Sequence, residues 1–495
     1  MSSLLRITDR DNVAVALEAI QAGQALEVAG LSFVAATDVP AGHKVALCDI
    51  PKDGHIIKYG FPIGYAKEDI AQGSHIHVHN LHTLLSGELE YVWHPTYPQV
   101  EPAEPMTFMG YRRKDGRVGI RNELWIVPTV GCVNDTARAL ERDAQKLVGG
   151  SVEHVYAFPH PYGCSQMGDD QENTRTVLAD LATHPNVGGV LVLGLGCENS
   201  GIEQIQKKMG SWDEDRVKFL ISQQVEDEHT AAMAILEELA ARMKAEDVRV
   251  PCPASELVVG LKCGGSDGFS GITANPVIGG LSDRLIAQGG TTILTEVPEM
   301  FGAETILMDR CGTEELFQKT VSLINDFKRY FEEHHQTIYE NPSPGNKAGG
   351  ISTLEDKALG CTQKSGFAPV MDVLRYGQKV HTHGLNLLSA PGNDLVAATA
   401  LSASGAHIVL FSTGRGTPFA CPVPTLKISS NSPLAGRKSN WIDFDAGRLL
   451  SEGKTLPELS GLLLEQVLRV ASGEAVCSEA HGFHDLAIFK TGVTL

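Results

Sequence analysis

Six of the ten cysteines in this 495-residue chain lie directly beside a glycine, and five of these six lie at the apparent ends of strands. Thiolates at such positions can ligate iron, zinc or an iron–sulfur cluster. The alternative is that each free cysteine is a small buried hydrophobic residue. Their spacing resembles neither a Cys-x-x-Cys ribbon nor a ferredoxin motif, so the residue types favour a metal site without fixing its ligands. The five are Cys132, Cys164, Cys197, Cys263 and Cys361.

Four carboxylates also lie in predicted loops at the ends of strands, like the five cysteines. Glu198 and Asp267 lie in two of the cysteine loops, and Glu296 and Glu299 follow the apolar run TTILT. Oxygen ligands of divalent ions and general acid–base groups both come from such positions. Each carboxylate taken alone is more often a helix cap or a solvated charge. We predict that Glu198 and Glu296 join the five cysteines as metal ligands and that Asp267 is catalytic.

The stretch GSHIHVHN alternates three histidines with two apolar residues. If it forms a strand, His75, His77 and His79 share one face. His43 and His55 belong to the same region, so several imidazoles can gather there. Such a cluster suits transition-metal binding or proton transfer near neutral pH, and the alternative is a polar strand face. We predict that His77 is catalytic and that His43 and His75 bind substrate.

Two further loops are suited to binding an acid. STGRGTP follows an apolar strand and offers backbone amides together with Arg415, whose guanidinium can hold a carboxylate. NPSPGNKAGG offers Lys347 as a base or as the partner of a substrate carboxylate. The alternatives are an ordinary tight turn and an exposed lysine. We predict catalytic roles for Arg415 and Lys347, and substrate contacts from Thr413, Asn346 and Ser266.

A dinucleotide site is disfavoured. The runs VLVLGLGCEN and STGRGT both begin like a G-x-G-x-x-G fingerprint, but neither completes it. Their glycines are explained by the tight turns that strand ends require. We therefore expect no nicotinamide cofactor.

The elements that must position these residues follow from apolar patterning. After residue 111, continuous runs of Val, Ile and Leu alternate with helical segments, which is typical of parallel sheets covered on both faces. Sites in such sheets form at the carboxyl ends of strands, so we expect the loops to converge. Short strands between Gly and Pro predict a small all-β domain before them. The predicted parts are the β domain 1–92, a proline-rich linker 93–111, and α/β domains 112–250 and 251–495.

Composition excludes several classes of protein. The net charge of −19 opposes binding to nucleic acid, and no basic block offsets it. No apolar run approaches the roughly 18 residues needed to span a bilayer. The N-terminus lacks the pattern of a signal peptide. We therefore expect a cytoplasmic protein with reduced thiols and neither membrane nor nucleic-acid partners.

The motifs taken together resemble those of the altronate/galactarate dehydratase family. The resemblance runs from about residue 8 to the C-terminus, and the ordered set is specific although single motifs are weak. HIHVHN and LGCTQK place the chain nearer the altronate branch than the galactarate branch. In order, the motifs are GHKVAL, IIKYG, GYA, HVHN, VGCVN, YGCSQ, GLGCEN, CGGSDGFSGITANP, TEVPEMFGAE, NPSPGNKAGG, LEDKALGCTQK, SAPGND, FSTGRGTP and LAIFKTGVTL.

The resemblance implies a fold, a cofactor and a reaction. The implied fold is α/β with an N-terminal β-clip (SAF-type) domain, a linker, a middle α/β dimerisation domain and a C-terminal Rossmann-like parallel-sheet domain carrying a metal site. The implied cofactor is Fe²⁺, or Mn²⁺ in its place, in a homodimer. The implied reaction takes D-altronate to 2-dehydro-3-deoxy-D-gluconate and water in hexuronate catabolism. Galactarate dehydration and sulfolactate sulfo-lyase activity are related alternatives.

That reaction explains why a cation is expected. Removing the C2 proton beside a carboxylate creates an enediolate with two negative charges, which a divalent cation can stabilise. We expect the cation among the cysteine and carboxylate loops, Lys347 or a histidine of the small domain as acid or base, and Arg415 as the group that orients the sugar acid. Two other classes remain open, namely an iron–sulfur hydro-lyase and a sugar-binding protein without activity.

Overall fold

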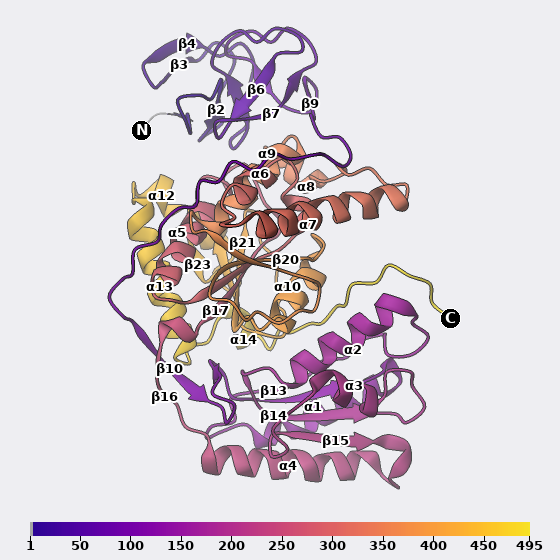
Figure 1. Ribbon diagram of the computed structural model, residues 1–495. Helices are drawn as coiled ribbons and strands as arrows, with labels where there is room; N and C mark the ends of the chain where they lie inside the picture. Colours follow the sequence, from indigo (N-terminus) through magenta and orange to yellow (C-terminus); the bar gives the residue numbers. More distant parts are fainter. Residues whose placement is uncertain (1–2) are drawn as a thin grey trace.

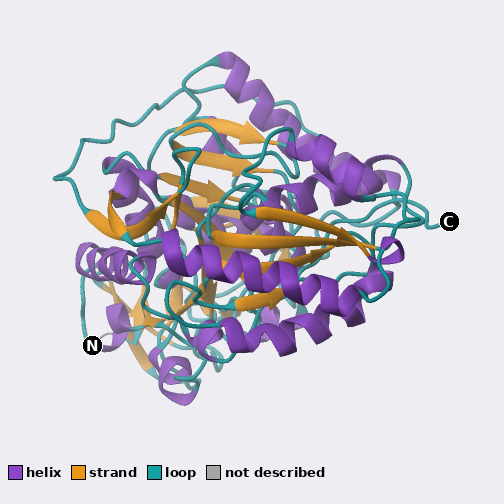
Figure 2. Cartoon of the chain, turned by 90° about the horizontal axis from the view of Figure 1, so that it is seen from below, coloured by secondary structure: helices purple, strands orange, loops and turns teal. Residues whose placement is uncertain are grey.

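A computed structural model describes residues 3–495 as three regions (Figure 1). The N-terminal β-rich region, drawn in indigo, lies at one end of the molecule, and the region that is central in the sequence, drawn in magenta, lies at the other. The C-terminal region lies between them. Helices flank the strands when the molecule is seen from below (Figure 2). Among residues 3–495, no helix has both the length and the apolarity required to cross a bilayer.

The N-terminal region is all-β, as the sequence predicts. Its strands pair antiparallel, in the orders β1-β2-β5-β8, β3-β4 and β6-β7-β9. Their inward-facing residues, among them Val15, Val45 and Ile56, are buried. The strands are β1 (Leu4–Leu5), β2 (Val13–Ala16), β3 (Ala25–Val28), β4 (Leu31–Val34), β5 (Lys44–Ala46), β6 (His55–Lys58), β7 (Phe61–Ala66), β8 (His75–Ile76) and β9 (Leu81–His82).

The histidine stretch is only partly a strand. Strand β8 ends at Ile76, and residues 77–80 form a turn in which Asn80 N donates to His77 O at 3.0 Å. Ile76 is buried, but Val78 is 40% exposed, so the alternation of faces stops after Ile76. The positions of the His77 and His79 imidazoles are therefore set by the backbone turn and not by an extended strand.

The proline-rich linker is extended and is bound along the C-terminal region. Residues 83–106 contain neither helix nor strand, and Thr96 N donates to Asp309 O at 2.8 Å. Strand β10 (Thr107–Arg112) then pairs with β11 (Val118–Gly119) and with β16 (Val250–Pro253). The chain therefore enters and leaves the middle region through neighbouring strands.

The middle region is built on a four-stranded parallel sheet in the order β13-β12-β14-β15. Strand β14 is buried along its whole length, which explains its continuous apolar sequence. The elements are β12 (Glu123–Pro128), α1 (Asn134–Ala144), β13 (Val155–Ala157), α2 (Gly168–Ala182), β14 (Val187–Gly194), α3 (Ile202–Met209), β15 (Val217–Ile221) and α4 (Glu228–Glu246).

The C-terminal region is built on a seven-stranded parallel sheet in the order β19-β20-β18-β17-β21-β22-β23. The chain first builds the sheet on one side of β17 and then returns to build the other side, so the strand order reverses at β17. The strands are β17 (Val258–Cys263), β18 (Thr291–Leu294), β19 (Val370–Leu374), β20 (Gly384–Leu388), β21 (Ile408–Thr413), β22 (Thr425–Ser429) and β23 (Phe444–Asp445).

The helices of this region are amphipathic or fully buried. Helix α7 illustrates the first case, because Thr313 caps its N-terminus and Phe317, Ile324 and Phe327 form its buried face. Helix α5 packs against α13. The helices are α5 (Ala274–Ala287), α6 (Glu304–Met308), α7 (Glu314–Glu333), α8 (Pro344–Ala348), α9 (Leu354–Thr362), α10 (Asp394–Ala403), α11 (Ser432–Arg437), α12 (Arg448–Ser451), α13 (Leu456–Ala471) and α14 (Cys477–Ala480).

A buried charge cluster joins the N-terminal region to helix α9. The carboxylate of Asp356 lies 2.8 Å from Lys44 Nζ and 2.9 Å from Lys58 Nζ, and all three side chains are almost completely buried. Burial lowers the pKa of Lys44 to about 8, although Asp356 opposes this shift. Asp356 is the shared counter-ion of these two buried ammonium groups, so it offsets part of the cost of burying them at this interface.

Candidate active site

Two cysteines and a glutamate meet at the carboxyl edge of the seven-stranded sheet. Cys263 is the last residue of β17, Glu299 ends the short 3-10 turn Val297–Glu299 after β18, and Cys361 lies in the last turn of α9. All three side chains are buried. Because the strand order reverses at β17, this edge is where open parallel sheets usually form their sites.

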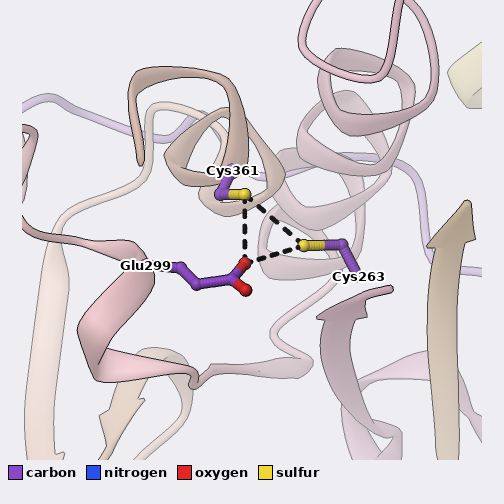
Figure 3. Close-up of side chains that lie close together, drawn as sticks. All are labelled: Cys263, Glu299 and Cys361. Carbon is purple, nitrogen blue, oxygen red and sulfur yellow. Dashed lines mark hydrogen bonds between the residues drawn. The ribbon is translucent and has the colours of Figure 1, made fainter. Parts of the chain in front are cut away.

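The ligand atoms of these residues form a compact triangle (Figure 3). Cys263 Sγ lies 3.4 Å from Cys361 Sγ and 3.1 Å from Glu299 Oε2, and Cys361 Sγ lies 3.3 Å from the same oxygen. These separations surround a point about 2 Å from each atom, close to the bond lengths of transition metals. Thiolate ligands favour iron or zinc over magnesium or calcium. Three protein ligands are typical of catalytic metal sites, which leave a position for substrate.

Three buried lysines lie around the triangle, and they pair with three carboxylates, one of which is Glu299 of the triangle itself. Their charges balance, so ionisation of both thiols would leave two negative charges, which one divalent cation neutralises. Glu296, a predicted ligand, is occupied by two of the lysines and by the backbone N–H of Cys263 at 3.0 Å. The ion pairs are Lys262 with Glu296 (2.5 Å) and Asp394 (2.9 Å), Lys364 with Glu296 (3.1 Å), and Lys357 with Glu299 (2.7 Å).

This environment sets the protonation states of the triangle. The hydrogen bond to Cys263, followed by burial, raises the pKa of Cys361 well above its usual value. Burial alone would favour neutral Glu299, but the lysine ammonium groups, Lys357 first among them, lower the pKa of this carboxyl. Glu299 is therefore ionised at neutral pH, whereas the thiol of Cys361 needs a bound cation to lose its proton.

The segment NPSPGNKAGG, residues 341–350, is tied to the triangle through Lys357. Lys357 Nζ donates to Asn341 Oδ1 at 3.0 Å and to Asn346 Oδ1 at 3.3 Å. Asn346 Nδ2 in turn donates to Ser266 O at 2.8 Å, in the loop after β17. Lys347 follows on α8 and is half-buried. The predicted residues Ser266 and Asn346 therefore lie in one network with the triangle, and Lys347 is the neighbour of Asn346 in the chain.

Asp267 is buried in the same loop and organises it. Its Oδ1 accepts hydrogen bonds from Ser430 Oγ at 2.8 Å and Ser270 Oγ at 2.9 Å, and its Oδ2 accepts from Asn431 Nδ2 at 3.1 Å. Burial raises the pKa of Asp267, although these donors oppose the shift. The carboxylate thus joins the loop after β17 to the start of α11.

The turn after β21 reaches the same segment. Thr413 Oγ1 accepts from Gly416 N at 2.8 Å, which shapes the turn. Arg415 is exposed, and its Nη1 donates to Gly345 O at 3.1 Å. The guanidinium therefore lies beside α8, at the solvent-exposed side of the network, where a substrate carboxylate can be bound.

The histidines of the N-terminal region lie against α8. His43 Nε2 lies 3.4 Å from Ala348 O, and its Nδ1 lies 3.0 Å from His75 Nε2. The ring centroids of His43 and His77 are 4.8 Å apart. Burial, helped by neighbouring basic groups that include Lys44, lowers the pKa of His75 to about 4 and that of His77 to about 3. These two imidazoles are therefore neutral at neutral pH.

We expect the free energy of unfolding to fall as the pH is lowered from the ordinary histidine pKa of 6.5 towards 4. Because the pKa values of His75 and His77 are lower in the folded protein, the unfolded chain binds more protons in this interval, and stability rises with pH. Urea unfolding at several pH values measures this slope. The His77→Gln variant should have a shallower slope, whereas the exposed-site control His381→Gln should match the wild type; equal slopes for all three proteins would contradict the prediction.

The other predicted metal ligands lie in the middle region, at the carboxyl edge of the four-stranded sheet. Glu198 accepts hydrogen bonds from Thr129 Oγ1 and Gly196 N, both at 2.6 Å. Burial opposes ionisation of this carboxyl, but the hydrogen bonds, that from Thr129 first, lower the pKa of Glu198. The structure therefore separates the predicted ligands into two groups. Cys263, Cys361 and Glu296 lie together, and Cys132, Cys164, Cys197 and Glu198 lie elsewhere.

Sequence patterns alone do not identify the three lysines around the triangle. They indicate Glu299 only as one of four candidate carboxylates. One usable signal is Lys262, which interrupts the apolar strand ELVVGLKC, because a charge inside a buried strand requires a partner. Lys357 and Lys364 give the same signal within LEDKALGCTQK, a segment that is buried on all sides.

Three family models match consecutive parts of the chain. Residues 2–84 match the altronate/galactarate dehydratase SAF domain. Residues 110–244 match the second domain of D-galactarate dehydratase/altronate hydrolase. Residues 254–494 match the C-terminal domain of D-galactarate/altronate dehydratase. The matches therefore cover all three regions of the fold.

Comparison of the whole chain with known proteins indicates the same family as the three domain matches. An altronate dehydratase of Bacillus subtilis (strain 168) is 54% identical over 498 residues, which cover 100% of both chains. An altronate dehydratase of Escherichia coli (strain K12) is 53% identical over 99% of both chains. A galactarate dehydratase (L-threo-forming) of Escherichia coli (strain K12) is 35% identical over 98% of this chain and 96% of its own. With its SAF, second and C-terminal domains in that order, the chain belongs to the D-galactarate/altronate dehydratase family.

Proposed function

We propose that this protein is a metal-dependent hydro-lyase that converts D-altronate to 2-dehydro-3-deoxy-D-gluconate and water. The observation that carries the proposal is the identity of more than half of its residues, along the full chain, to two altronate dehydratases. The galactarate dehydratase is more distant, at 35% identity. The buried triangle of Cys263, Glu299 and Cys361 supports the same chemistry, because it can hold a divalent cation.

The proposed cation is Fe²⁺, with Mn²⁺ as its substitute, held by Cys263, Glu299 and Cys361. When bound, it supplies the positive charge that an enediolate requires. Around it, Lys357 and Lys364 add buried positive charge, paired with Glu299 and Glu296. The oxygen-only alternatives, magnesium and calcium, suit two sulfur ligands poorly.

We propose that the remaining predicted residues act on the sugar acid itself. Arg415 binds the substrate carboxylate, because its guanidinium lies at the solvent-exposed side of the network. His77 accepts the C2 proton, since it lies beside His43, which reaches α8. Lys347 donates a proton to the C3 hydroxyl, which leaves as water, and the resulting enol becomes the ketone when C3 is protonated. Asp267, predicted to be catalytic, is instead proposed to hold the catalytic loop through its hydrogen bonds with Ser430 and Asn431. Substrate hydroxyls bind to His43, His75, Ser266, Asn346 and Thr413.

The proposal extends to the cellular context. It includes a cytoplasmic homodimer that associates through the middle domain, residues 112–250, and acts in hexuronate catabolism. The N-terminal domain, residues 1–92, and the linker, residues 93–111, then deliver the histidines to the Rossmann-like catalytic domain, residues 251–495. These statements are supported by the family resemblance, and sedimentation of the purified protein measures the assembly.

An anaerobic assay with a substrate panel tests the proposed function. After chelator treatment, the protein should release no 2-keto-3-deoxy acid from altronate, and Fe²⁺ should restore activity because the thiols need a cation to ionise. The value of kcat/KM for altronate should exceed those for galactarate and sulfolactate by at least about ten-fold. Full activity of metal-free protein would overturn the metal assignment, and preference for another substrate would overturn the altronate assignment.

A further inference from the structure

A second group of thiols lies outside the proposed active site, in the middle region. Cys132 follows β12, Cys164 follows β13 and Cys197 follows β14, and β12 lies between the other two strands in a parallel sheet. The three cysteines thus occupy corresponding positions at the carboxyl edge of three adjacent strands. All three are unoxidised and exposed, so none of them is explained as a packed hydrophobic residue.

Backbone contacts fix the three cysteine loops against one another. Gly131 N donates to Tyr162 O at 2.9 Å, and Ser200 N donates to Gly163 O at 3.0 Å. Gly163 must be glycine, because it has φ +98° and an added Cβ would lie 2.0 Å from Thr129 O. The positions of the thiols are therefore set by the fold and not by free loop motion.

Several hydrogen-bond donors near the thiols lack a partner in the part of the chain that the structure describes, although each neighbouring helix carries an acidic residue in its first turn. Each cysteine lies just before a helix, namely α1, α2 or α3, and the N-terminal N–H groups of helices carry partial positive charge. In the described chain, none of these three helices has a side-chain hydrogen bond at its N-cap. Two buried groups of the cysteine loops, Gln166 Nε2 and Ser200 Oγ, also have no partner among residues 3–495. Unpartnered buried donors point to an acceptor that the polypeptide does not supply.

The spacing of the thiols argues against a single ion held by all three. Within residues 3–495, the Sγ atoms of Cys132, Cys164 and Cys197 do not all lie within 4.8 Å of one another, unlike the triangle around Cys263. In an iron–sulfur cluster each thiolate binds a different iron, so its ligands lie farther apart than those of one ion. We propose that Cys132, Cys164 and Cys197 bind a [4Fe–4S] cluster, whose fourth iron is open to an external ligand.

Iron and acid-labile sulfide measured on the full chain test this proposal. After anaerobic reconstitution with Fe²⁺ and sulfide, the wild type should hold about four sulfides per chain and show the visible absorption of a cluster. Each of the variants Cys132→Ser, Cys164→Ser and Cys197→Ser should retain less than about a quarter of that sulfide, because a thiolate ligand is lost. Cys48→Ser is the matched control, since Cys48 is also exposed, and it should retain the wild-type amount.

The result does not depend on the proposed activity, because sulfide and absorption are measured without substrate. Cys263→Ser should keep the sulfide even if dehydration is lost, which separates the two sites. Wild-type protein that binds iron without sulfide would overturn the proposal, as would wild-type sulfide content in the Cys132→Ser, Cys164→Ser and Cys197→Ser variants. If those variants fail to fold, the sulfide content of the reconstituted wild type by itself supports or overturns the proposal.

Discussion

Replacement of Cys263 by serine is expected to lower kcat/KM for altronate by more than about a hundred-fold. Replacement of a group that only positions a metal ligand lowers metal affinity or activity by about 10–100-fold. Loss of a ligand itself should therefore lower activity more. Cys263 contacts both other members of the triangle, with its Sγ at 3.4 Å from Cys361 Sγ and 3.1 Å from Glu299 Oε2. A serine hydroxyl in this place is a harder and more weakly acidic donor, which a transition metal binds less well than a thiolate.

Steady-state kinetics with added Fe²⁺, together with the iron content of the chelator-washed protein, measure this effect. Cys421→Ser is the matched control, because Cys421 is also buried and already contacts the hydroxyls of Thr425 and Ser402. The control should keep activity within a few-fold of the wild type. Wild-type kinetics and iron content in Cys263→Ser would show that the triangle is not the metal site.

Replacement of Asp356 by asparagine is expected to lower the free energy of unfolding by about 3–5 kcal/mol, the usual cost of leaving a buried ion pair without one partner. The change keeps the shape of the side chain but leaves Lys44 and Lys58 without a counter-charge, and both lysines are almost completely buried. These lysines belong to the N-terminal domain, and Asp356 belongs to α9 of the C-terminal domain. The substitution should therefore weaken the interface between the two domains.

Urea unfolding measures the loss, and limited proteolysis of the segment 83–106 reports on the interface. That segment should be cut faster in Asp356→Asn, because separation of the N-terminal domain exposes it. Asp326→Asn removes an exposed ion pair with Arg329 and should change stability by no more than about 0.5 kcal/mol. If Asp356→Asn unfolds like this control, the buried cluster does not hold the domains together.

This interface also bears on activity, because the histidines reach α8 only while the N-terminal domain is docked. His43 lies 3.4 Å from Ala348 O, and Lys44, the next residue, forms part of the charge cluster. Lys44 also donates to Gly350 O at 2.7 Å, at the end of the segment that carries Asn346 and Lys347. The proposed site is therefore completed by two domains that are distant in the sequence.

Much of the fold was predictable because its signals are local. Continuous apolar runs predict the buried parallel strands, such as β14 and β17, and the segment 313–335 has the helical periodicity observed in α7. The histidine stretch shows the limit of such reasoning. Its alternation predicts a longer strand, but the chain turns after Ile76 because Asn80 binds the backbone at His75 and His77.

By itself, the sequence determined the family, the all-β and parallel α/β regions, and a set of cysteines at strand ends. Only the tertiary structure decided which of those cysteines share a site. Cys263 and Cys361 are 98 residues apart and come within 3.4 Å, whereas Cys197 occupies an equivalent strand end in another sheet. A local motif reports that a strand ends in a loop, but the neighbours of that loop depend on strand order and helix packing, which are long-range properties of the chain.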